Sequence, residues 1–494
     1  MLEREVKLAA PPGFRLPELD GIDGVTATAP ERLDRLATYW DAEDLRLVRW
    51  GATLRHRAGE GWTVKLPRGE ADGLLSRTEI VFPGGPGRPP REAVELLLAH
   101  LHGSPLQPVA RMRTIRLRVV LRDAEGERAA EIVDDEVSVL EGRRVAARFR
   151  ELEVELGAAS ANGLLGRVVA RLEAAGAAVQ EPLPKLVRAL GPRALAPPEV
   201  VVPDAGPDSP AGDVVRRALA ASVARFLAHD PGLVLGSDAE DTHQARVALR
   251  RLRSDLRTFR PLVEDDWCRS LRAEAKWLGA LLGEVRDAEV MRDGMRERAA
   301  PLPPADRAAL AGVLAGLDDV REEARGRLLA ARREPRFAAL VDRLVHAAGE
   351  PALLPEADRP ALEVLPPLAA RPWRRLRRAR KKLDADSSDA ELHALRLLTK
   401  RARYAAEAVA PALGRPARRF ARAASELQDV LGDHQDATLT QAWLRGRAVA
   451  ATPAQAFACG ELCAVEARLA LESRAAWTSA WKPLARRGRQ AFGR

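Results

Sequence analysis

The chain has 494 residues, of which 46% are apolar, so it is long enough for two to four globular domains, each with a core. Its formal net charge of +9 predicts a negatively charged partner, but charge alone does not distinguish nucleic acid, a membrane surface and a phosphate polymer. No apolar run reaches the roughly 18 residues of a membrane span. The first residues do not have the pattern of a signal peptide, and three cysteines are too few for a disulfide framework. We therefore expect a cytoplasmic protein that does not enter a membrane.

The N-terminal part, residues 1–196, predicts an antiparallel β-domain. Short segments in which apolar and charged residues alternate recur along it, namely EREVKL, ATLRHR, WTVKLP, RTEIVF, TIRLRVVL, RAAEIVDDEVSV and RFRELEVEL. This period of two is typical of strands, and many short strands with few helices indicate a single sheet or barrel. Residues 197–212, which are rich in Pro, Gly, Asp and Ser, are expected to form a linker.

The C-terminal part, residues 213–494, predicts an all-α domain, because its long Ala, Leu and Arg segments have helical periodicity. It holds 50 Lys and Arg against 38 Asp and Glu, a net charge of +12, whereas residues 1–212 have a net charge of −3. The surface for an anionic partner is therefore expected on the C-terminal part.

Ionisable residues, most of them grouped by sign, share strand faces in the N-terminal part, because side chains at i and i+2 lie on the same side of a strand. The sets formed in this way are Glu3, Glu5 and Lys7; Arg55 and Arg57; Arg77 and Glu79; Arg111 and Arg113; Glu131 and Asp135; and Glu151, Glu153 and Glu155. In a closed sheet these groups would point into one lumen, where carboxylates can hold a divalent cation and arginines can hold phosphate oxygens. The alternative is a half-buried sheet with a solvated charged face.

The segment Glu3-x-Glu5-x-Lys7 resembles the ExExK signature of the CYTH domain, the family of triphosphate tunnel metalloenzymes, and Tyr39–Arg57 resembles the family's second block. The resemblance implies an eight-stranded antiparallel tunnel that binds triphosphate with Mg²⁺ or Mn²⁺. The metal ligands it implies are Glu3, Glu5, Glu131, Asp135, Glu151, Glu153 and Glu155. The phosphate-binding residues it implies are Lys7, Arg55, Arg57, Lys65, Arg111, Arg113 and Lys185, and the candidate catalytic residues are Glu5, Lys7 and Glu153.

Two segments of the C-terminal part repeat one pattern of basic residues. HQARVALRRLRSDLRTF begins at His243 and HALRLLTKRARYAAEAV begins at His393, 150 residues later, and in both segments basic residues follow the histidine at +3, +7, +8 and +10. The segments LLGEVRDAEV and VLGDHQDATL also match each other, at an offset of 149 residues. Two motifs at nearly the same offset indicate an internal duplication of a helical bundle.

Positions 0, +3, +7 and +10 share one side of a helix, so each copy predicts a stripe of one histidine and three basic residues. Like charges at this spacing repel one another, and a bound polyanion would relieve the repulsion. The alternative is a solvated surface stripe, and a structural role for the two histidines also stays open. The candidate polyanion-binding residues are His243, Arg246, Arg250, Arg253, Arg374, Arg378, His393, Arg396, Lys400 and Arg403. Aromatic residues, which stack on bases in nucleic-acid-binding proteins, make up only 4% of the chain, and this scarcity favours a partner without bases.

The paired motifs resemble the CHAD domain, a family of duplicated helical bundles associated with inorganic polyphosphate. The predicted fold class is therefore α+β multidomain, with an eight-stranded antiparallel β-tunnel followed by an all-α domain of two duplicated bundles. The predicted function is metal-dependent hydrolysis of inorganic or related triphosphate in the tunnel, with polyphosphate bound by the helical domain. Such a protein would be free in the cytoplasm or associated with polyphosphate granules. The alternatives are a non-catalytic polyphosphate-binding scaffold and a nucleotidyl cyclase.

Overall fold

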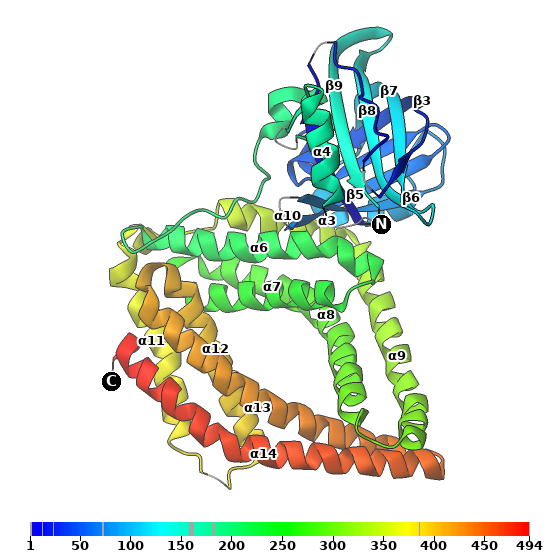
Figure 1. Cartoon of the computed structure of the whole chain (residues 1–494). Helices are drawn as coiled ribbons and strands as arrows, with labels where there is room; N and C mark the ends of the chain where they lie inside the picture. Colours follow the sequence, from blue (N-terminus) through cyan, green and yellow to red (C-terminus); the bar gives the residue numbers. More distant parts are fainter. Residues whose placement is uncertain are drawn as a thin grey trace. The chain divides into compact units, whose positions relative to one another are not determined.

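The computed structural model describes the chain except for residues 1, 12, 23, 72–73, 158–162, 180–182, 385 and 494, and it describes no side chains for residues 2–5, 68–71 and 74–76. The chain folds into two compact units, Met1–Glu199 and Val200–Arg494. The first unit is built on an antiparallel sheet and the second is all-helical (Figure 1). The fold class is thus the predicted α+β class.

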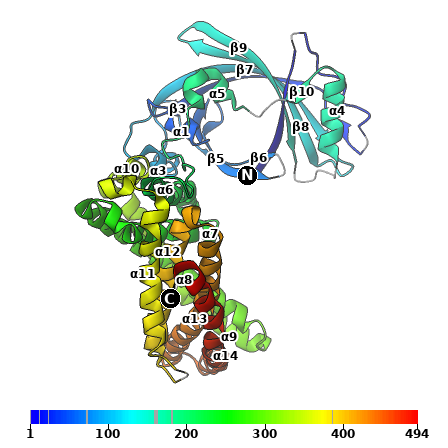
Figure 2. The same cartoon turned by 90° about the vertical axis from the view of Figure 1, so that its left-hand side faces the viewer.

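One antiparallel sheet organises the first unit, and the described residues contribute ten strands to it. The strands are β1 (Leu2–Ala9), β2 (Thr26–Ala27), β3 (Glu31–Asp41), β4 (Thr53–Arg57), β5 (Gly61–Ala71), β6 (Leu74–Phe82), β7 (Gln107–Arg122), β8 (Arg128–Glu141), β9 (Arg144–Leu156) and β10 (Ala178–Val179). Their order is β10-β1-β6-β5-β4-β3-β7-β8-β9, and β1 also pairs with β9, so the sheet closes into a ring (Figure 2). The predicted count of eight matches the strands of the ring but omits the two-residue strands β2 and β10.

The pairing register decides which side chains point into the ring. Lys7 pairs with Glu153, and Arg35 pairs with Thr114. Because directly paired residues point to the same side of a sheet, odd-numbered residues face the lumen on β1, β3 to β6, β8 and β9. On β7 the even-numbered residues face the lumen instead.

Apolar side chains on the outer face of the ring form its main core. Leu152 and Val154 of β9 are fully buried there, against α4 (Leu164–Ala174). The buried residues of α4 are Leu164, Val168 and Leu172, which recur every four residues and so share one side of the helix. The ring therefore has an apolar, covered outside at this point and a charged inside.

Short helices complete the first unit and fill part of the lumen. They are α1 (Arg46–Arg49), α2 (Arg91–Glu95), α3 (Leu98–Leu101), α5 (Lys185–Leu190) and the 3-10 helix η1 (Gly191–Leu195). Leu186 and Val187 of α5 join a buried cluster with Met112 and Val137. Since both strand residues face the lumen, α5 closes the apolar part of the interior and leaves the charged part as a cavity.

The second unit consists of long helices that pack in chain order. They are α6 (Ala211–Leu235), α7 (Ala239–Thr258), α8 (Asp265–Ala299), α9 (Pro304–Arg332), α10 (Pro335–Gly349), α11 (Ala361–Arg380), α12 (Asp389–Leu413), α13 (Arg415–Ala448) and α14 (Pro453–Phe492), with 3-10 helices η2 (Arg260–Leu262) and η3 (Pro355–Asp358). Helices α6 to α10 form one bundle and α11 to α14 the other (Figure 1). Phe226 and Phe337 meet in the first core, and Trp373 and Phe420 meet in the second.

The two copies of the basic motif lie on α7 and α12, which contact each other. Each helix begins at a polar cap. The Asp238 side chain accepts a hydrogen bond from the Glu240 backbone, and Ser388 and Glu391 form a capping box at the start of α12. The caps fix where each helix begins, and with it the face on which the basic residues lie.

Candidate functional site

A cavity of about 270 Å³ lies inside the ring of strands and is lined mainly by charged side chains. The described cations of its lining are Lys7, Arg35, Arg55, Arg57, Lys65, Arg77, Arg116 and Lys185. The described carboxylates are Glu60, Glu79, Asp135, Glu153 and Glu155. Cations outnumber carboxylates, so the lining suits a small polyanion.

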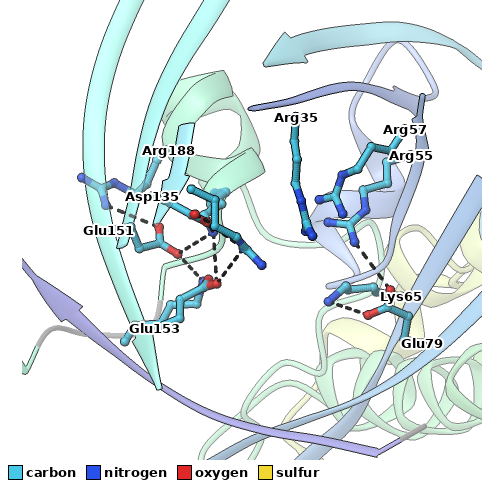
Figure 3. A network of polar contacts seen from close by, with 12 residues as sticks. Arg35, Arg55, Arg57, Lys65, Glu79, Asp135, Glu151, Glu153 and Arg188 are labelled. Carbon is cyan, nitrogen blue, oxygen red and sulfur yellow. Dashed lines mark hydrogen bonds and ion pairs between the residues drawn. The ribbon is translucent and has the colours of Figure 1, made fainter. Parts of the chain in front are cut away.

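Three arginines lie together on one side of this cavity, Arg35, Arg55 and Arg57 (Figure 3). Nη1 of Arg57 donates to Oε2 of Glu60 at 2.5 Å, and Nη2 of Arg55 lies 3.5 Å from Oε1 of Glu79. The Nε groups of Arg55 and Arg57 are buried and donate to no acceptor within the described part of the chain. A phosphate oxygen in the cavity would supply the acceptor that these donors lack.

Burial and mutual repulsion act on the arginine cluster. Burial lowers the pKa of Arg57, and the adjacent Arg55 lowers it further. Burial and the charge of Arg116 likewise lower the pKa of Arg35. Burial alone would raise the pKa of the Tyr39 hydroxyl, but Arg55 outweighs it and the pKa lies below its ordinary value. A bound anion would offset the repulsion among these cations.

Three carboxylates, Asp135, Glu151 and Glu153, lie on the other side of the cavity (Figure 3). Two lysines bind them. Nζ of Lys7 donates to Glu151 and to Glu153, each at 2.6 Å. Nζ of Lys185 donates to Asp135 at 2.5 Å and lies 3.1 Å from Glu153. Burial raises the pKa of Glu151 to about 7. Burial also opposes ionisation of Glu153, but Lys185 and Lys7 outweigh it and hold the pKa of Glu153 well below its ordinary range.

The structure brings most of the predicted phosphate-binding residues together. Those that line the cavity are Lys7, Arg55, Arg57, Lys65 and Lys185. The prediction that Arg111 and Arg113 face the lumen is wrong, because β7 turns its even-numbered residues inward. Arg113 is 57% exposed and pairs with Asp34 at 2.5 Å, and Arg111 lies beside His56 on the outer surface.

The predicted metal ligands divide into three groups. Asp135, Glu153 and Glu155 line the cavity, and Glu151 is buried beside them at Lys7. The second group is Glu131 alone, which is buried and accepts hydrogen bonds from Arg118 and Arg128 rather than lining the cavity. The side chains of Glu3 and Glu5, the third group, lie outside the described residues.

The lining carboxylates match a hard divalent cation in donor chemistry, since Mg²⁺ and Mn²⁺ take oxygen ligands. The backbone of Glu5 pairs with Glu155, so the predicted ligands of β1 and β9 lie on neighbouring strands. Among the side chains that the structure describes, no cluster of three or more His, Cys, Asp or Glu residues converges as a metal site. The ligand set therefore fits by chemistry and strand placement.

Five charged lining residues were not among the predicted site residues, namely Arg35, Glu60, Arg77, Glu79 and Arg116. Arg116 donates two hydrogen bonds to Asp135, at 2.8 and 2.7 Å. The alternation in TIRLRVVL, with apolar residues at 115, 117 and 119, could have identified Arg116 as the lumen-facing arginine of β7. Glu60 lies in a tight turn between strands, where strand parity gives no signal.

In the helical unit, each predicted stripe packs against one of the two matching segments LLGEVRDAEV and VLGDHQDATL, and the contact is the same in both copies. A Cβ added at Gly283 of α8 would lie 3.7 Å from the Arg246 guanidinium, and one added at Gly432 of α13 would lie 3.4 Å from that of Arg396. Nη1 of Arg246 also donates to Asp287 at 2.6 Å. The glycine of each matching segment thus lies in van der Waals range of the first arginine of its stripe.

The two stripes converge where α7 meets α12. Burial lowers the pKa of Lys400 to about 8, and Arg250, Arg396 and Arg246 lower it in the same direction. Arg250 and Arg246 belong to the first copy of the motif, whereas Arg396 and Lys400 belong to the second. Arg250, Arg396 and Lys400 form no ion pair with any described residue. The charge of Asp436 acts on Arg396 and Lys400 and offsets part of the repulsion among the three cations, and a bound polyanion would offset the rest.

The remaining predicted residues of the helical unit have diverse surroundings. His243 lines a separate cavity, and burial lowers its pKa. Nδ1 of His393 is buried and lacks a partner in the described chain. Nε of Arg403 donates to Glu407 at 2.8 Å. An added Cβ at Gly279 would lie 3.9 Å from Arg253. Arg374 and Arg378 are exposed on α11.

Comparison with known proteins agrees with this architecture. Residues 1–169 match the CYTH domain, and residues 217–445 match the CHAD domain. Two uncharacterized proteins, one from each of two strains of Mycobacterium tuberculosis, are 33% identical to the chain over 511 residues, which is 96% of this chain and 94% of each relative. The chain therefore belongs to the family of proteins in which a CYTH domain is followed by a CHAD domain, as the sequence predicted.

Solved structures show similarity over parts of the chain. PptA from Streptomyces chartreusis is 27% identical, with a TM-score of 0.47, and the match covers 56% of this chain and 100% of that one. The CHAD domain from the plant Ricinus communis is 25% identical, with a TM-score of 0.46, over 58% of this chain and 97% of that one. The CYTH family includes triphosphatases and cyclase-like enzymes, commonly dependent on Mg²⁺ or Mn²⁺. None of the described helices is both long and apolar enough to span a bilayer.

Proposed function

We propose that the tunnel hydrolyses inorganic triphosphate, or a related triphosphate, and that the helical unit binds inorganic polyphosphate. The observation that supports the first half is the division of charge inside the ring. An arginine cluster with unused Nε donors faces a group of buried carboxylates across a cavity of about 270 Å³. This arrangement suits a short chain of phosphates with a cation beside it.

The lining residues have separate tasks in this reaction, because phosphoryl transfer depends mainly on positioning and charge stabilisation. Arg55 and Arg57 would bind the phosphate oxygens and hold the chain in line. Glu153 and Glu155, with Glu5, would hold Mg²⁺ or Mn²⁺, which when bound neutralises phosphate charge and lowers the pKa of water. Lys7 keeps Glu153 ionised and ready to act as a ligand.

The alternatives for the tunnel are a nucleotidyl cyclase and a scaffold without turnover. The cavity lies just below the roughly 300–1,000 Å³ typical of pockets for drug-sized ligands. Its described lining contains a single aromatic ring, that of Tyr39, which is buried beside Arg55. Both facts favour inorganic triphosphate over a nucleotide as the tunnel's substrate.

The test is phosphate release from triphosphate by the full chain with Mg²⁺ or Mn²⁺. We expect release that stops when the metal is chelated, and Arg55→Ala should lower kcat/KM by about 100-fold, as removal of one charge-stabilising donor does. Arg113→Ala is the matched control, since this arginine belongs to the same sheet but points outward. If the wild-type protein releases no phosphate, or if both variants lose activity equally while remaining folded, the tunnel is not the active site.

The second half of the proposal is supported by the convergence of the two basic stripes at α7 and α12, where Arg250, Arg396 and Lys400 form no ion pair with a described residue. Its test is a competition assay with fluorescent long-chain polyphosphate bound to the full chain. Unlabelled polyphosphate should displace it, and duplex DNA or RNA at equal phosphate concentration should not, because the stripes lack aromatic residues for stacking on bases. Equal displacement by nucleic acid would contradict the assignment.

A further inference from the structure

A second cavity, of about 720 Å³, lies inside the helical unit between α6, α7, α12 and α13. Its volume is in the range of small-molecule sites, roughly 300–1,000 Å³. Among its described lining residues are five arginines, Arg217, Arg225, Arg250, Arg251 and Arg403. Guanidinium groups in this number indicate a ligand that carries phosphate or other anionic groups.

The same cavity also presents hydrogen-bond acceptors, which set it apart from a plain polyanion site. Asp255 lies at its floor with 1% of its surface exposed, and Gln428 and Glu407 also line it. Neither oxygen of Asp255 accepts a hydrogen bond from a described residue, and the carbonyl oxygen of the Gln428 side chain is also buried without a partner. The Arg251 Nε lies 3.4 Å from Asp255 Oδ1, an ion-pair distance. Buried acceptors without donors are destabilising, so a donor supplied by a ligand would relieve this cost.

Comparison of the two repeats shows that neither carboxylate is shared by both copies. At the 150-residue offset of the histidines, Asp255 of the first copy corresponds to Ala405, and Glu407 of the second copy corresponds to Arg257. Each copy therefore has one carboxylate at a position where the other copy has alanine or arginine. Fold symmetry does not require this difference, since the equivalent helix accommodates alanine in place of the aspartate.

Inorganic polyphosphate does not account for these carboxylates. At neutral pH its chain offers acceptor oxygens and almost no donors, so it has nothing to donate to Asp255 or Gln428, whereas Glu407 already accepts hydrogen bonds from Arg251 and Arg403. A nucleoside triphosphate offers both kinds of group, with phosphates for the arginines and N–H and O–H donors on base and sugar. Tyr404 is covered by the guanidinium groups of Arg250 and Arg251 at 5.7 and 5.6 Å, so the base would be recognised by its edge rather than by stacking.

We propose that this cavity is a second binding site of the helical unit, specific for a nucleoside triphosphate. The phosphates contact Arg217, Arg225 and Arg251, and the base or sugar donates to Asp255 and Gln428. Arg250 and Arg403 are shared with the basic stripes, so occupancy of the cavity competes with polyphosphate for these two side chains. The site itself does not depend on polyphosphate binding or on activity in the tunnel.

The test is isothermal titration calorimetry of the full chain carrying Arg55→Ala and Arg57→Ala, which weaken phosphate binding in the tunnel, with the divalent metal chelated. ATP and GTP are each compared with inorganic triphosphate. We expect at least one nucleotide to bind about tenfold more tightly than triphosphate. Asp255→Ala should abolish that difference while long-chain polyphosphate still binds. Glu472→Ala, which removes an exposed carboxylate of α14, is the charge-matched control and should leave the difference intact.

A purely structural role for Asp255 gives a different result. If its contact with Arg251 stabilised the fold, Asp255→Ala would lower the melting temperature; an unsatisfied carboxylate predicts an unchanged or higher one. If that variant does not fold, Gln428→Ala tests the same preference for a nucleotide. The proposal is overturned if neither nucleotide binds more tightly than triphosphate, or if the variant weakens all three ligands equally. Phosphate release by the protein with an intact tunnel is measured separately, so failure of one proposal leaves the other standing.

Discussion

The tunnel and the basic stripes both bring cations together, but they differ in how many of these cations form ion pairs with carboxylates. In the tunnel, Lys7 bonds to two buried glutamates, and Arg57 bonds to Glu60. On the helices, Arg250, Arg396 and Lys400 are close together and form no ion pair with a described residue, although the charge of Asp436 acts on Arg396 and Lys400. The tunnel pairs most of its cations with carboxylates, whereas the helical unit leaves these three cations without an ion pair.

This difference teaches how each region would bind phosphate. An enclosed network whose cations are mostly paired with carboxylates has a weak electric field at long range. A ligand must therefore enter the cavity and displace existing ion pairs, and its recognition depends on local geometry. A surface with unpaired cations has a long-range field that attracts a flexible polyanion, and its affinity falls as salt screens it. The first arrangement suits a short substrate held in a defined position, and the second suits a long chain held along a surface.

The largest expected effect comes from breaking ion pairs in the tunnel. Lys7→Met leaves Glu151 and Glu153 buried with only the more distant cations of Lys185, Arg188 and Arg116 beside them. Removing one partner of a buried ion pair costs about 3 kcal/mol or more, so the free energy of unfolding of the first unit should fall by about that amount at pH 8. Chemical denaturation followed by tryptophan fluorescence measures it.

The pH dependence of this loss has a definite sign. Burial already raises the pKa of Glu151 to about 7, and removal of Lys7 raises it further. A carboxyl whose pKa is raised by folding is destabilising when ionised, so the loss that comes from Glu151 should be small below pH 7, where this carboxyl is protonated with or without Lys7, and should grow as the pH rises through 7. Arg113→Ala, which breaks an exposed ion pair, should show no such dependence. A loss that is constant between pH 5 and 8 would contradict this pairing of Lys7 with Glu151.

The next largest effect concerns the basic stripes. Replacing Arg250, Arg253, Lys400 and Arg403 by Ala should weaken binding of long-chain polyphosphate by about 100-fold at physiological salt. The slope of log affinity against log salt concentration should decrease in magnitude by about 3, if counterion release follows the rule for single-stranded nucleic acids. Fluorescence anisotropy over a series of salt concentrations provides both numbers.

A control variant that loses the same number of charges elsewhere separates the effect of the basic stripes from the effect of net charge. Arg260, Arg269, Arg336 and Arg359 are exposed, and each forms an ion pair with a nearby carboxylate. Replacing these four by Ala removes the same charge and should change polyphosphate affinity by less than about threefold. Equal loss in both quadruple variants would mean that polyphosphate responds to total charge and not to the stripes.

Sequence reasoning identified the ring, its charged interior and most of its cations because strand alternation is a local property. It failed at β7, because alternation divides the residues of a strand between two faces but does not show which face points into the lumen. Pairing with β3 and β8 decides that question, and such pairing is set by distant parts of the chain. Arg113 was therefore assigned to the lumen in place of Arg116.

In the helical unit the sequence predicted the stripes, because the spacing of the basic residues and the internal repeat are both patterns of the sequence itself. It did not predict that Lys400 would meet Arg250, since α12 and α7 are 150 residues apart at these positions and only packing brings them together. Asp255 was missed for a similar reason. Its unsatisfied oxygens depend on which side chains of α12 and α13 surround it.

The smallest of these effects is a pH dependence of polyphosphate binding that originates at Lys400. Burial and three neighbouring arginines lower its pKa to about 8, so the free protein loses this charge as the pH rises through 8. Bound polyphosphate would favour the charged form and raise the pKa again, so binding should take up a proton. Affinity should be full below pH 7 and fall by up to about tenfold between pH 7 and pH 9. Lys400→Arg retains its charge over this range, and its affinity should stay nearly constant. If wild type and Lys400→Arg lose affinity in parallel, another group titrates, and the convergence of the two stripes at Lys400 does not control binding.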